Sequence, residues 1–327
     1  MKLEQTKILV TGGAGYIGSH ACKALKQAGF EPVVFDHLGR GHESSVKWGP
    51  LIRGDLRDRA ILERCLKEHR IRAVMHFAAY AYVGESTENP GLYYENNVGG
   101  TLNLLEAMKV TGVDTLVFSS TCATYGNPTT IPMTEEHPQA PINPYGASKW
   151  MSERMILDFQ RAHGLKSALL RYFNAAGADP AGEIGENHEP ETHLIPLAVR
   201  GALRGEALRI FGTDYPTPDG SCIRDYIHVS DLADAHVLAL QGMMEGGGSG
   251  IYNLGNGSGY SVLEVVRMVE QVTGRSIRQE VWPRRAGDPP VLIANAHRAR
   301  QTLGWAPRYP DLETIVRHAV EWERKKS

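Results

Sequence analysis

The stretch VTGGAGYIGSH, residues 10–20, decides the fold because it joins the first predicted strand to the first predicted helix through a glycine loop. Gly12, Gly15 and Gly18 permit a tight turn, a close approach of the backbone to a pyrophosphate, and close packing of the helix on the strand. The N-terminus of that helix then faces the phosphates. The next strand ends at Asp36, where a carboxylate can accept hydrogen bonds from the adenosine ribose and would repel a 2′-phosphate. The loop therefore predicts a dinucleotide site that favours NAD over NADP.

A second acidic residue, Asp55 in IRGDLRD (residues 52–58), follows the next predicted strand and is placed to reach the adenine. An aspartate after a strand is also a common helix cap, so Asp55 alone has two interpretations. For the glycine loop, the alternative is a glycine-rich turn beside an exposed Asp36. The order strand, loop, helix, strand and aspartate disfavours that alternative.

The composition restricts the classes of partner. The chain has 327 residues, 42% of them hydrophobic, which suffices for one large or two ordinary domains with a core. A formal charge of -2 and the lack of a long basic run argue against nucleic acid, so we expect a small-molecule partner. We also expect no signal peptide and no membrane span, because no apolar run is long enough for either. The four cysteines lack CxxC spacing, which predicts no metal site, no disulfide framework and a cytoplasmic location; they are Cys22, Cys65, Cys122 and Cys222.

Short β-branched runs alternate with helical patterns through the first half of the chain. This alternation is typical of βαβ units, and it predicts an α/β fold with a doubly wound parallel sheet, the Rossmann arrangement, over residues 1–175. The runs that carry it include KILVTGG (7–13), PVVFD (32–36), IRAVMHFAA (71–79), DTLVFSS (114–120) and SALLRYFN (167–174).

The second half is interrupted by glycine- and proline-rich turns, which predict a smaller α/β domain over residues 176–327. A helix near residues 230–243 is expected to begin at Ser230 or Asp231. We expect that helix to pack back on the first domain.

The stretch NPYGASK, which begins at Asn143, places a tyrosine four residues before a lysine. Asn143 is a good N-cap and Pro144 a good first helical residue, so a helix is predicted to start there and run to Gly164. Tyr145 then lies in the first turn, where the helix dipole favours an anion, and Lys149 lies on the same face. Both effects are expected to lower the pKa of the phenol.

The size of the required pKa change limits its sources. A free phenol has a pKa near 10 and must fall by about three pH units, which is about 4 kcal/mol, to act as a base at neutral pH. A helix dipole contributes at most about 2 kcal/mol, so the ammonium of Lys149 and the charge of the cofactor must supply the rest. Taken alone, the pair also fits an amphipathic helix with a surface lysine and a half-buried tyrosine.

The combination of motifs carries a family resemblance. In order and spacing, TGGAGYIG (11–18), DTLVFSSTCATYG (114–126), NPYGASK and LLRYFNAAGA (169–178) resemble the extended short-chain dehydrogenase/reductase family. Within it, the chain is most similar to the UDP-glucose 4-epimerases, and the resemblance continues through FGTDYPTPDG (211–220) and RDYIHVSDLADAH (224–236). It covers essentially the whole chain.

The resemblance implies roles for individual residues. Tyr145 is the implied catalytic base, Lys149 binds the nicotinamide ribose, and Thr121, where many members have a serine, bonds the sugar hydroxyl. These three residues also belong to the implied cofactor site, whose other members are Gly12, Gly15, Tyr16, Ile17, Gly18, Asp36, Asp55, Leu56, Phe77, Ala78, Ala79, Ala81, Asn96 and Phe173. Thr121 and Tyr145 also belong to the implied substrate site, whose other members are Asn174, His193, Leu194, Phe211, Arg224, Arg285, Asp288 and Leu292.

Some of these positions depart from the family or allow another interpretation. Ala81 replaces a lysine seen in several members, and His193 falls where an asparagine is common. Guanidinium groups bind a diphosphate with two parallel hydrogen bonds, which suits Arg224 and Arg285. Either arginine alone also fits a surface ion pair, for example with Asp225 or Asp288.

The resemblance implies interconversion of UDP-glucose and UDP-galactose through a transient 4-keto sugar, with NAD tightly bound and regenerated in each cycle. Nucleotide-sugar dehydratases and UDP-glucuronate decarboxylases share the first step. They carry an Asp-Glu or a Ser-Glu pair where this chain has Cys122 and Ala123, so elimination is disfavoured. A non-enzymatic NAD-binding regulator is disfavoured by the joint presence of Thr121, Tyr145 and Lys149.

The range of sugars is left open by the sequence. Leu292 stands where the family varies between a bulky tyrosine and smaller residues, a position associated with N-acetylated sugars, so UDP-GlcNAc is an alternative substrate. The sequences STCATYG (120–126) and RYFNAAGA (171–178) also resemble those of relatives that act on UDP-xylose and UDP-arabinose. The resemblance further implies a homodimer joined by the helix around residues 92–108 and the helix that begins at Tyr145.

Overall fold

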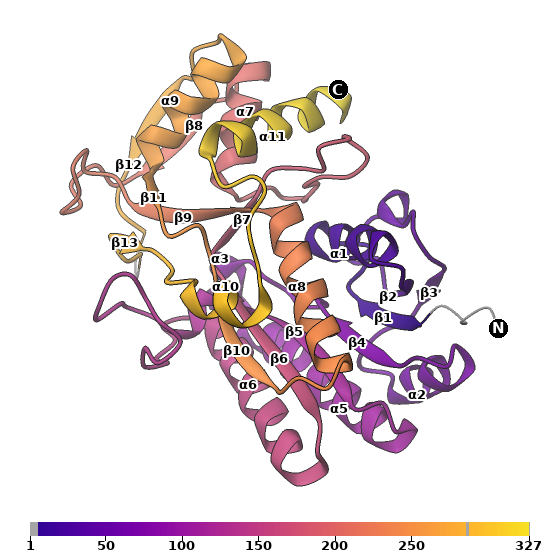
Figure 1. Ribbon diagram of the computed structural model, residues 1–327. Coiled ribbons are helices and arrows are strands. Elements are labelled where there is room, and N and C mark those ends of the chain that lie inside the picture. The colour runs from indigo at the N-terminus through magenta and orange to yellow at the C-terminus, as the bar shows by residue number, and fades with distance from the viewer. Residues whose placement is uncertain (1–5, 286–287, 327) are drawn as a thin grey trace.

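Seven parallel strands form the central sheet of the protein (Figure 1). The computed structural model describes residues 6–285 and 288–326. In spatial order the strands are β10 (Gly250–Leu254), β6 (Lys166–Tyr172), β5 (Thr115–Thr121), β4 (Ala73–His76), β1 (Lys7–Thr11), β2 (Glu31–Asp36) and β3 (Leu51–Arg53). The chain thus winds outward from β1 in both directions, and the predicted doubly wound sheet is confirmed.

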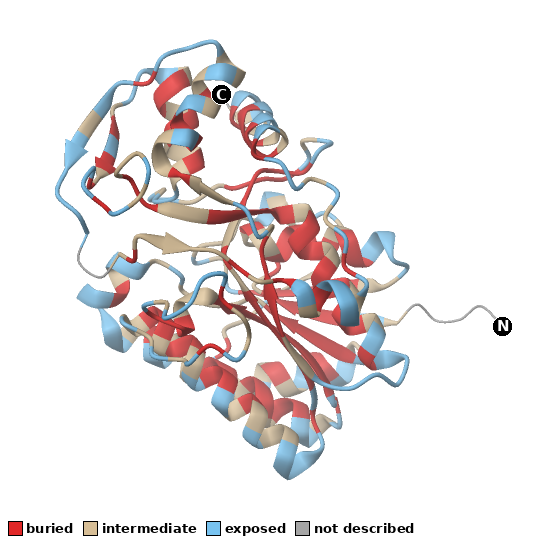
Figure 2. Cartoon of the chain, turned by 60° about the vertical axis from the view of Figure 1, so that its left-hand side comes forward, coloured by how far each residue is buried: buried red, intermediate tan, exposed pale blue. Residues whose placement is uncertain are grey.

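Helices cover both faces of this sheet, because its strands are apolar on both sides. Ile8 and Val10 of β1 contribute to one hydrophobic cluster, and Leu9 between them contributes to the other. The first cluster packs against α1 (Tyr16–Gln27), α8 (Val229–Met244) and α10 (His297–Leu303). The second packs against α2 (Arg59–Glu68), α5 (Gly100–Thr111) and α6 (Pro144–His163). Figure 2 shows the buried strands between helices whose outer faces are exposed.

The rest of the chain builds a smaller α/β part above the carboxyl ends of the large sheet (Figure 1). Its strands are β7 (Asn174–Ala176), β9 (Ile223–His228), β11 (Gly259–Ser261) and β13 (Val291–Leu292) in one sheet, and β8 (Leu208–Phe211) with β12 (Gln279–Trp282) in another. Its helices share one hydrophobic cluster; they are α7 (Leu194–Arg204), α9 (Val262–Thr273) and α11 (Leu312–Lys326). Since β10 joins the first sheet and α8 packs on α1, the chain crosses between the two parts several times, and the division at residue 175 remains a prediction.

Short elements complete the chain between the strands. They are α3 (Val83–Glu88), α4 (Pro90–Tyr93), the π-helical turn η2 (Tyr94–Gly99) and the 3-10 turns η1 (Glu43–Ser45) and η3 (Cys122–Thr124).

Within the described residues, no helix combines the length and apolar character that crossing a bilayer requires.

The start of α8 corrects one expectation from the sequence. The helix begins at Val229, not at Ser230 or Asp231. Its cap is His228, whose Nδ1 accepts a hydrogen bond from the Ser230 amide at 3.1 Å. A histidine is not among the usual N-cap residues, so the sequence pattern placed the start at the first conventional cap.

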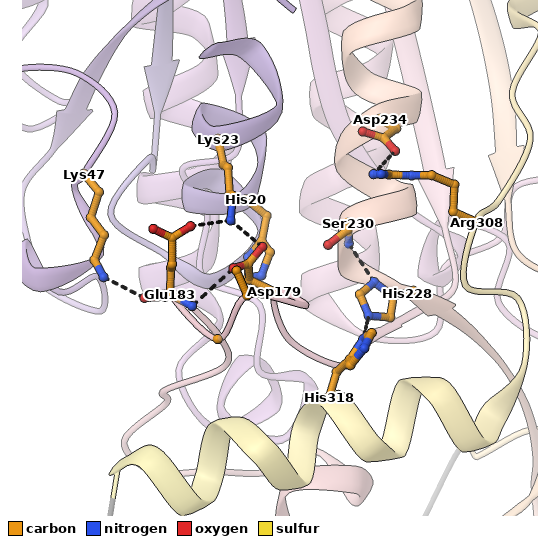
Figure 3. A network of polar contacts seen from close by, with 12 residues as sticks. His20, Lys23, Lys47, Asp179, Glu183, His228, Ser230, Asp234, Arg308 and His318 are labelled. Atoms are coloured by element: carbon orange, nitrogen blue, oxygen red, sulfur yellow. Dashed lines mark hydrogen bonds and ion pairs between the residues drawn. The ribbon is translucent and has the colours of Figure 1, made fainter. Parts of the chain in front are cut away.

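Polar side chains tie the smaller part to the first helices of the large sheet (Figure 3). Lys23 of α1 donates to Asp179 at 2.7 Å, and Lys47 donates to the carbonyl of Glu183 at 2.7 Å. Within the smaller part, a ring nitrogen of His318 in α11 lies 2.9 Å from one of His228 at the end of β9. The two lysine contacts thus join the smaller part to the α1 side of the large sheet, and the histidine contact joins α11 to β9.

Candidate active site

One cavity of about 1020 Å³ lies where the carboxyl ends of the parallel strands meet the smaller part. Every residue that the sequence predicts for the cofactor or the substrate lines it, from Gly12 after β1 to Leu292 in β13. The predicted positions are thus brought together from segments far apart in the chain. Such a crevice at the carboxyl ends of the strands is the usual ligand site of an open α/β sheet.

The glycine loop leaves no room for larger residues. Gly12 has φ +72°, and a Cβ there would lie 2.6 Å from the amide nitrogen of Ala78. A Cβ on Gly18 would lie 2.2 Å from the Gly12 carbonyl oxygen. The loop therefore packs as tightly as the pyrophosphate interpretation requires.

Asp36 at the end of β2 is oriented by backbone amides. Its Oδ2 accepts from the Ala14 amide at 3.0 Å and its Oδ1 from the Leu38 amide at 2.8 Å. Each carboxylate oxygen has a further lone pair for a ribose hydroxyl. The loop and the carboxylate together fit the adenosine diphosphate half of NAD.

Asp55 is not the cap that it resembles. The cap of α2 is Asp58, which accepts from the Ile61 amide at 3.1 Å. Asp55 lines the cavity and pairs with Arg57, whose Nη2 lies 2.6 Å from its Oδ2. The Arg57 hydrogen bonds hold the pKa of Asp55 below its usual value, so the carboxylate is ionised.

The helix α6 carries the tyrosine and the lysine as predicted. It is capped by the Asn143 Oδ1, which accepts from the Gly146 amide at 2.8 Å, and it ends at Gly164 with φ +72°. Tyr145 is 8% exposed and Lys149 is 4% exposed. The lysine is therefore not on the surface and the tyrosine is more than half-buried, contrary to the alternative interpretation. The Lys149 Nζ donates to the Ser119 carbonyl at 2.9 Å, which anchors it at the end of β5.

The pKa of the phenol corrects an expectation. Burial raises the pKa of Tyr145 above its ordinary value, although a hydrogen bond with Thr121 opposes this. Burial also lowers the pKa of Lys149 to about 7, against the attraction of Glu153. The expectation of a lowered tyrosine pKa is therefore not met by the polypeptide alone, in which burial is the largest influence on the phenol.

The two predicted arginines both line this cavity. Arg224 donates from Nη1 to the carbonyls of Ile223 and Pro289, both at 2.9 Å, and its Nη2 lies 3.3 Å from Asp288. The ion pair given as the alternative is thus formed, with the guanidinium still lining the cavity. The Arg285 guanidinium lies 4.2 Å from the ring centroid of Phe211.

His193 has partners that the sequence did not suggest. It precedes α7, and its Nδ1 lies 2.6 Å from Glu186 and 3.1 Å from Glu191. His188 contacts the same two carboxylates. The signal was present in the spacing of ENHEPETH (186–193), which repeats Glu-x-His.

Other residues of the cavity wall were also missed. The hydroxyl of Tyr172 lies 2.9 Å from the Ser119 Oγ, and Arg40 pairs with Glu85. Arg40 lies in a loop and Glu85 in the short helix α3, and neither segment has a hydrophobic periodicity that would mark these residues in the sequence. Tyr172 was detectable, since it lies near the end of the predicted strand run SALLRYFN and is the last residue of β6.

Known proteins share this fold and this arrangement. Residues 8–255 match the NAD dependent epimerase/dehydratase family. The UDP-glucose 4-epimerase of Rhizobium meliloti is 53% identical over 326 residues, which is 99% of each chain. The chain belongs to this family. The resemblance drawn from the motifs is confirmed.

Solved structures of epimerases in this family agree with the fold. The UDP-glucose 4-epimerase of Brucella ovis in complex with NAD has a TM-score of 0.94 at 51% identity, covering 97% of this chain and 98% of that one. The enzyme of Stenotrophomonas maltophila, with bound NAD and formylated UDP-arabinopyranose, has a TM-score of 0.95 at 40% identity, covering 98% and 99%. Both are epimerases whose architecture this chain shares over nearly its whole length.

Proposed function

We propose that this chain interconverts UDP-glucose and UDP-galactose by 4-epimerisation, through a transient 4-keto sugar and with NAD tightly bound. The observation that carries the proposal is the meeting of Tyr145, Thr121 and the glycine loop in one cavity, with Cys122 and Ala123 beside them. Relatives named UDP-glucose 4-epimerase, about half identical over nearly the full chain, support it.

The cofactor end of the cavity suits NAD. The loop from Gly12 to Gly18 would hold the pyrophosphate, Asp36 the ribose diol, and Lys149 the nicotinamide ribose. When bound, NAD supplies the acceptor and later the donor of the hydrogen at sugar C4. Its positive nicotinamide also offsets the burial that raises the pKa of Tyr145.

The protein's own groups move and hold the proton. The Tyr145 oxygen accepts the proton of the sugar 4-hydroxyl and returns it to the oxygen of the epimer. The Thr121 hydroxyl accepts from the Ala123 amide at 3.1 Å, so its own proton is a donor, which is directed at the Tyr145 oxygen here and would orient the sugar oxygen when substrate is bound. The keto sugar turns over between these steps, while Arg224 and Arg285 hold the diphosphate.

Elimination or decarboxylation is disfavoured by the neighbours of Thr121. Burial raises the pKa of Cys122 to about 12, so its thiol stays neutral at neutral pH. Ala123 has no ionisable group. With no carboxylic acid at these two positions to expel a hydroxyl, the 4-keto sugar is reduced and released.

We also propose that the protein is a homodimer and that it is cytoplasmic. A homodimer joined through α5, with the preceding turn η2, and α6 is supported by large apolar residues that stand exposed on these elements, namely Tyr94, Leu102, Val110 and Met151. All four cysteines are free, which supports a cytoplasmic enzyme of galactose metabolism. We propose no nucleic-acid and no membrane partner.

A second candidate function is the 4-epimerisation of other UDP-sugars by the same chemistry. Leu292 is half-buried and packs on the cluster of Tyr125, Met133 and Phe173, where it borders the cavity. A side chain of this size leaves UDP-GlcNAc as an alternative, and the epimerase bound to formylated UDP-arabinopyranose favours testing UDP-pentoses.

One experiment tests the function and its range. Purified protein is incubated, without added NAD, with UDP-galactose, UDP-GalNAc and UDP-xylose in separate reactions, and the 4-epimers are separated by chromatography. We expect UDP-glucose from UDP-galactose. Formation of no 4-epimer from any of the three would defeat the proposal.

A further inference from the structure

The loop that leads into α7 gathers four metal-ligating side chains. Glu186, His188, Glu191 and His193 each offer one ligand atom, and these atoms all lie within 4.8 Å of one another. The four distances from a histidine Nδ1 to a glutamate Oε1 are 2.6, 3.0, 3.1 and 3.8 Å. Ligands of a tetrahedral zinc ion, with bonds of about 2.0 Å, stand about 3.3 Å apart. The observed separations bracket that value.

Burial gives a second and independent indication of a cation. The side chain of Glu191 is 1% exposed and that of Glu186 is 6% exposed, so both carboxylates are withdrawn from water. The Oε2 of Glu191 is buried and has no hydrogen-bond partner. Two carboxylates close together in such a place need a compensating positive charge.

The backbone of the loop is held in place by residues outside the cluster. Trp322 of α11 donates from its indole nitrogen to the Glu186 carbonyl at 2.9 Å. A ring nitrogen of His42 lies 2.7 Å from the Asn187 carbonyl oxygen. The fold therefore holds the loop backbone in place at Glu186 and at the neighbouring Asn187, as expected of a preorganised metal site.

We propose that this loop binds one divalent transition-metal ion of the zinc type through Glu186, His188, Glu191 and His193. Imidazole nitrogens suit zinc and its neighbours, whereas magnesium and calcium require oxygen ligands. With four protein ligands, the site is of the closed, structural kind. This replaces the sequence-based expectation that the chain has no metal site.

The position of the ion gives it a structural role beside the cavity. Glu186, His188 and His193 line the cavity, and the His188 ring packs edge to face on Tyr16 with centroids 6.1 Å apart. The ion would fix the loop that leads into α7 and hold the His188 ring against Tyr16 at the glycine loop. It would shape the wall that faces a bound nucleotide sugar and take no part in the proton transfer at Tyr145.

The test uses full-length protein from which any affinity tag has been removed, because a tag would bind metal itself. The protein is treated with a chelator, reconstituted with Zn²⁺ or Co²⁺, dialysed, and measured for metal content and visible absorption. We expect one equivalent of retained zinc per chain, and with cobalt the intense visible bands of a tetrahedral site. His188→Asn and Glu191→Gln should each lose the metal and the bands.

Matched controls separate the site from chance binding. Glu189→Gln alters an exposed carboxylate of the same loop, and His297→Asn alters an exposed histidine elsewhere; both should retain the metal. Circular dichroism establishes that the two cluster variants are folded. The proposal is overturned if the parent protein retains no zinc and no cobalt, because the cluster is then only a pair of imidazolium–carboxylate ion pairs. Unchanged stoichiometric zinc in both cluster variants would also overturn it.

Discussion

The Arg171 guanidinium and the Glu153 carboxylate form a buried ion pair one helical turn below Lys149, with Nη2 and Oε2 2.6 Å apart. The exposed fractions of the two side chains are 4% and 1%. Glu153 also accepts from the Ser120 hydroxyl at 2.5 Å, so the pair fixes α6 against the end of β5. The ion pair therefore sets the distance between Tyr145 on the helix and Thr121 on the strand.

Glu153→Gln should destabilise the protein by about 3 kcal/mol, because it leaves the Arg171 charge buried without its counter-ion. Turnover should fall as well, since the Tyr145–Thr121 spacing is disturbed. Chemical denaturation and initial rates measure the two effects. Asp158→Asn, which removes an exposed ion pair with Arg161 on the same helix, is the control and should cost less than about 1 kcal/mol. Equal stability of the two variants would argue against this role.

Gly18→Ala should abolish tight NAD retention, because a Cβ at that position meets the Gly12 carbonyl oxygen at 2.2 Å. The loop must then open, and the phosphate contacts are lost. The matched control is Gly242→Ala near the end of α8, where a Cβ meets nothing within 4 Å. Bound NAD is measured by absorbance after denaturing the purified proteins. If Gly18→Ala retained as much NAD as Gly242→Ala, the loop assignment would be wrong.

His76 should make the protein sensitive to acid. It is buried between hydroxyls, with Thr11 Oγ1 at 2.6 Å and Thr101 Oγ1 at 3.0 Å, and burial lowers its pKa to about 3. An unfolded histidine, with a pKa near 6.5, binds a proton that the folded one does not. The contribution of His76 is therefore complete above pH 6.5 and is lost as the pH falls, by about 1.4 kcal/mol per unit between pH 6 and pH 4.

The pH dependence has a direct comparison. His76→Asn should lower the stability at pH 7 and flatten the slope of unfolding free energy against pH by about one proton. Denaturation series at several pH values between 4 and 7 supply the slopes of the variant and of the parent protein. An unchanged slope in His76→Asn would mean that His76 is protonated in the fold.

The proposed homodimer should depend on the apolar residues of α5 and α6. Leu102 is 43% exposed and Met151 is 38% exposed, although both are large and apolar. We expect the double variant Leu102→Glu with Met151→Glu to sediment as a monomer, because charges would be buried at the interface. Val281→Glu, at a residue of β12 that is 68% exposed, should remain dimeric. A parent protein that sediments as a monomer would contradict the assembly.

The sequence predicted the large sheet because its determinants are local. Gly12 and Gly18 need no distant partner to identify a strand-to-helix loop, and Asn143 with Gly164 marks both ends of α6 correctly. The return of β10 to the edge of the sheet was not predicted. Its partner, β6, lies about eighty residues earlier in the chain, and no local pattern encodes that pairing.

The sequence could predict those members of the candidate site that belong to a short local motif. Tyr145, Lys149 and Asp36 were predicted to share a site because Asp36 ends a strand and the other two belong to a motif at the start of a helix, and all three line one cavity. The direction in which the pKa of Tyr145 is shifted could not be predicted from the sequence, because desolvation depends on how the whole chain packs over the phenol. The cluster that includes Glu186 and His188 was missed for a related reason, since its loop folds back on itself without periodicity.

The measurement that tests the central claim most directly is the turnover of UDP-galactose by Tyr145→Phe, with bound NAD determined on the same sample. The substitution removes only the hydroxyl oxygen that accepts the sugar proton. We predict a loss of at least about 100-fold in turnover with NAD retained, while Tyr252→Phe, outside the cavity, keeps the activity of the parent protein. Turnover by Tyr145→Phe equal to that of the parent protein would contradict the assignment of Tyr145 as the base.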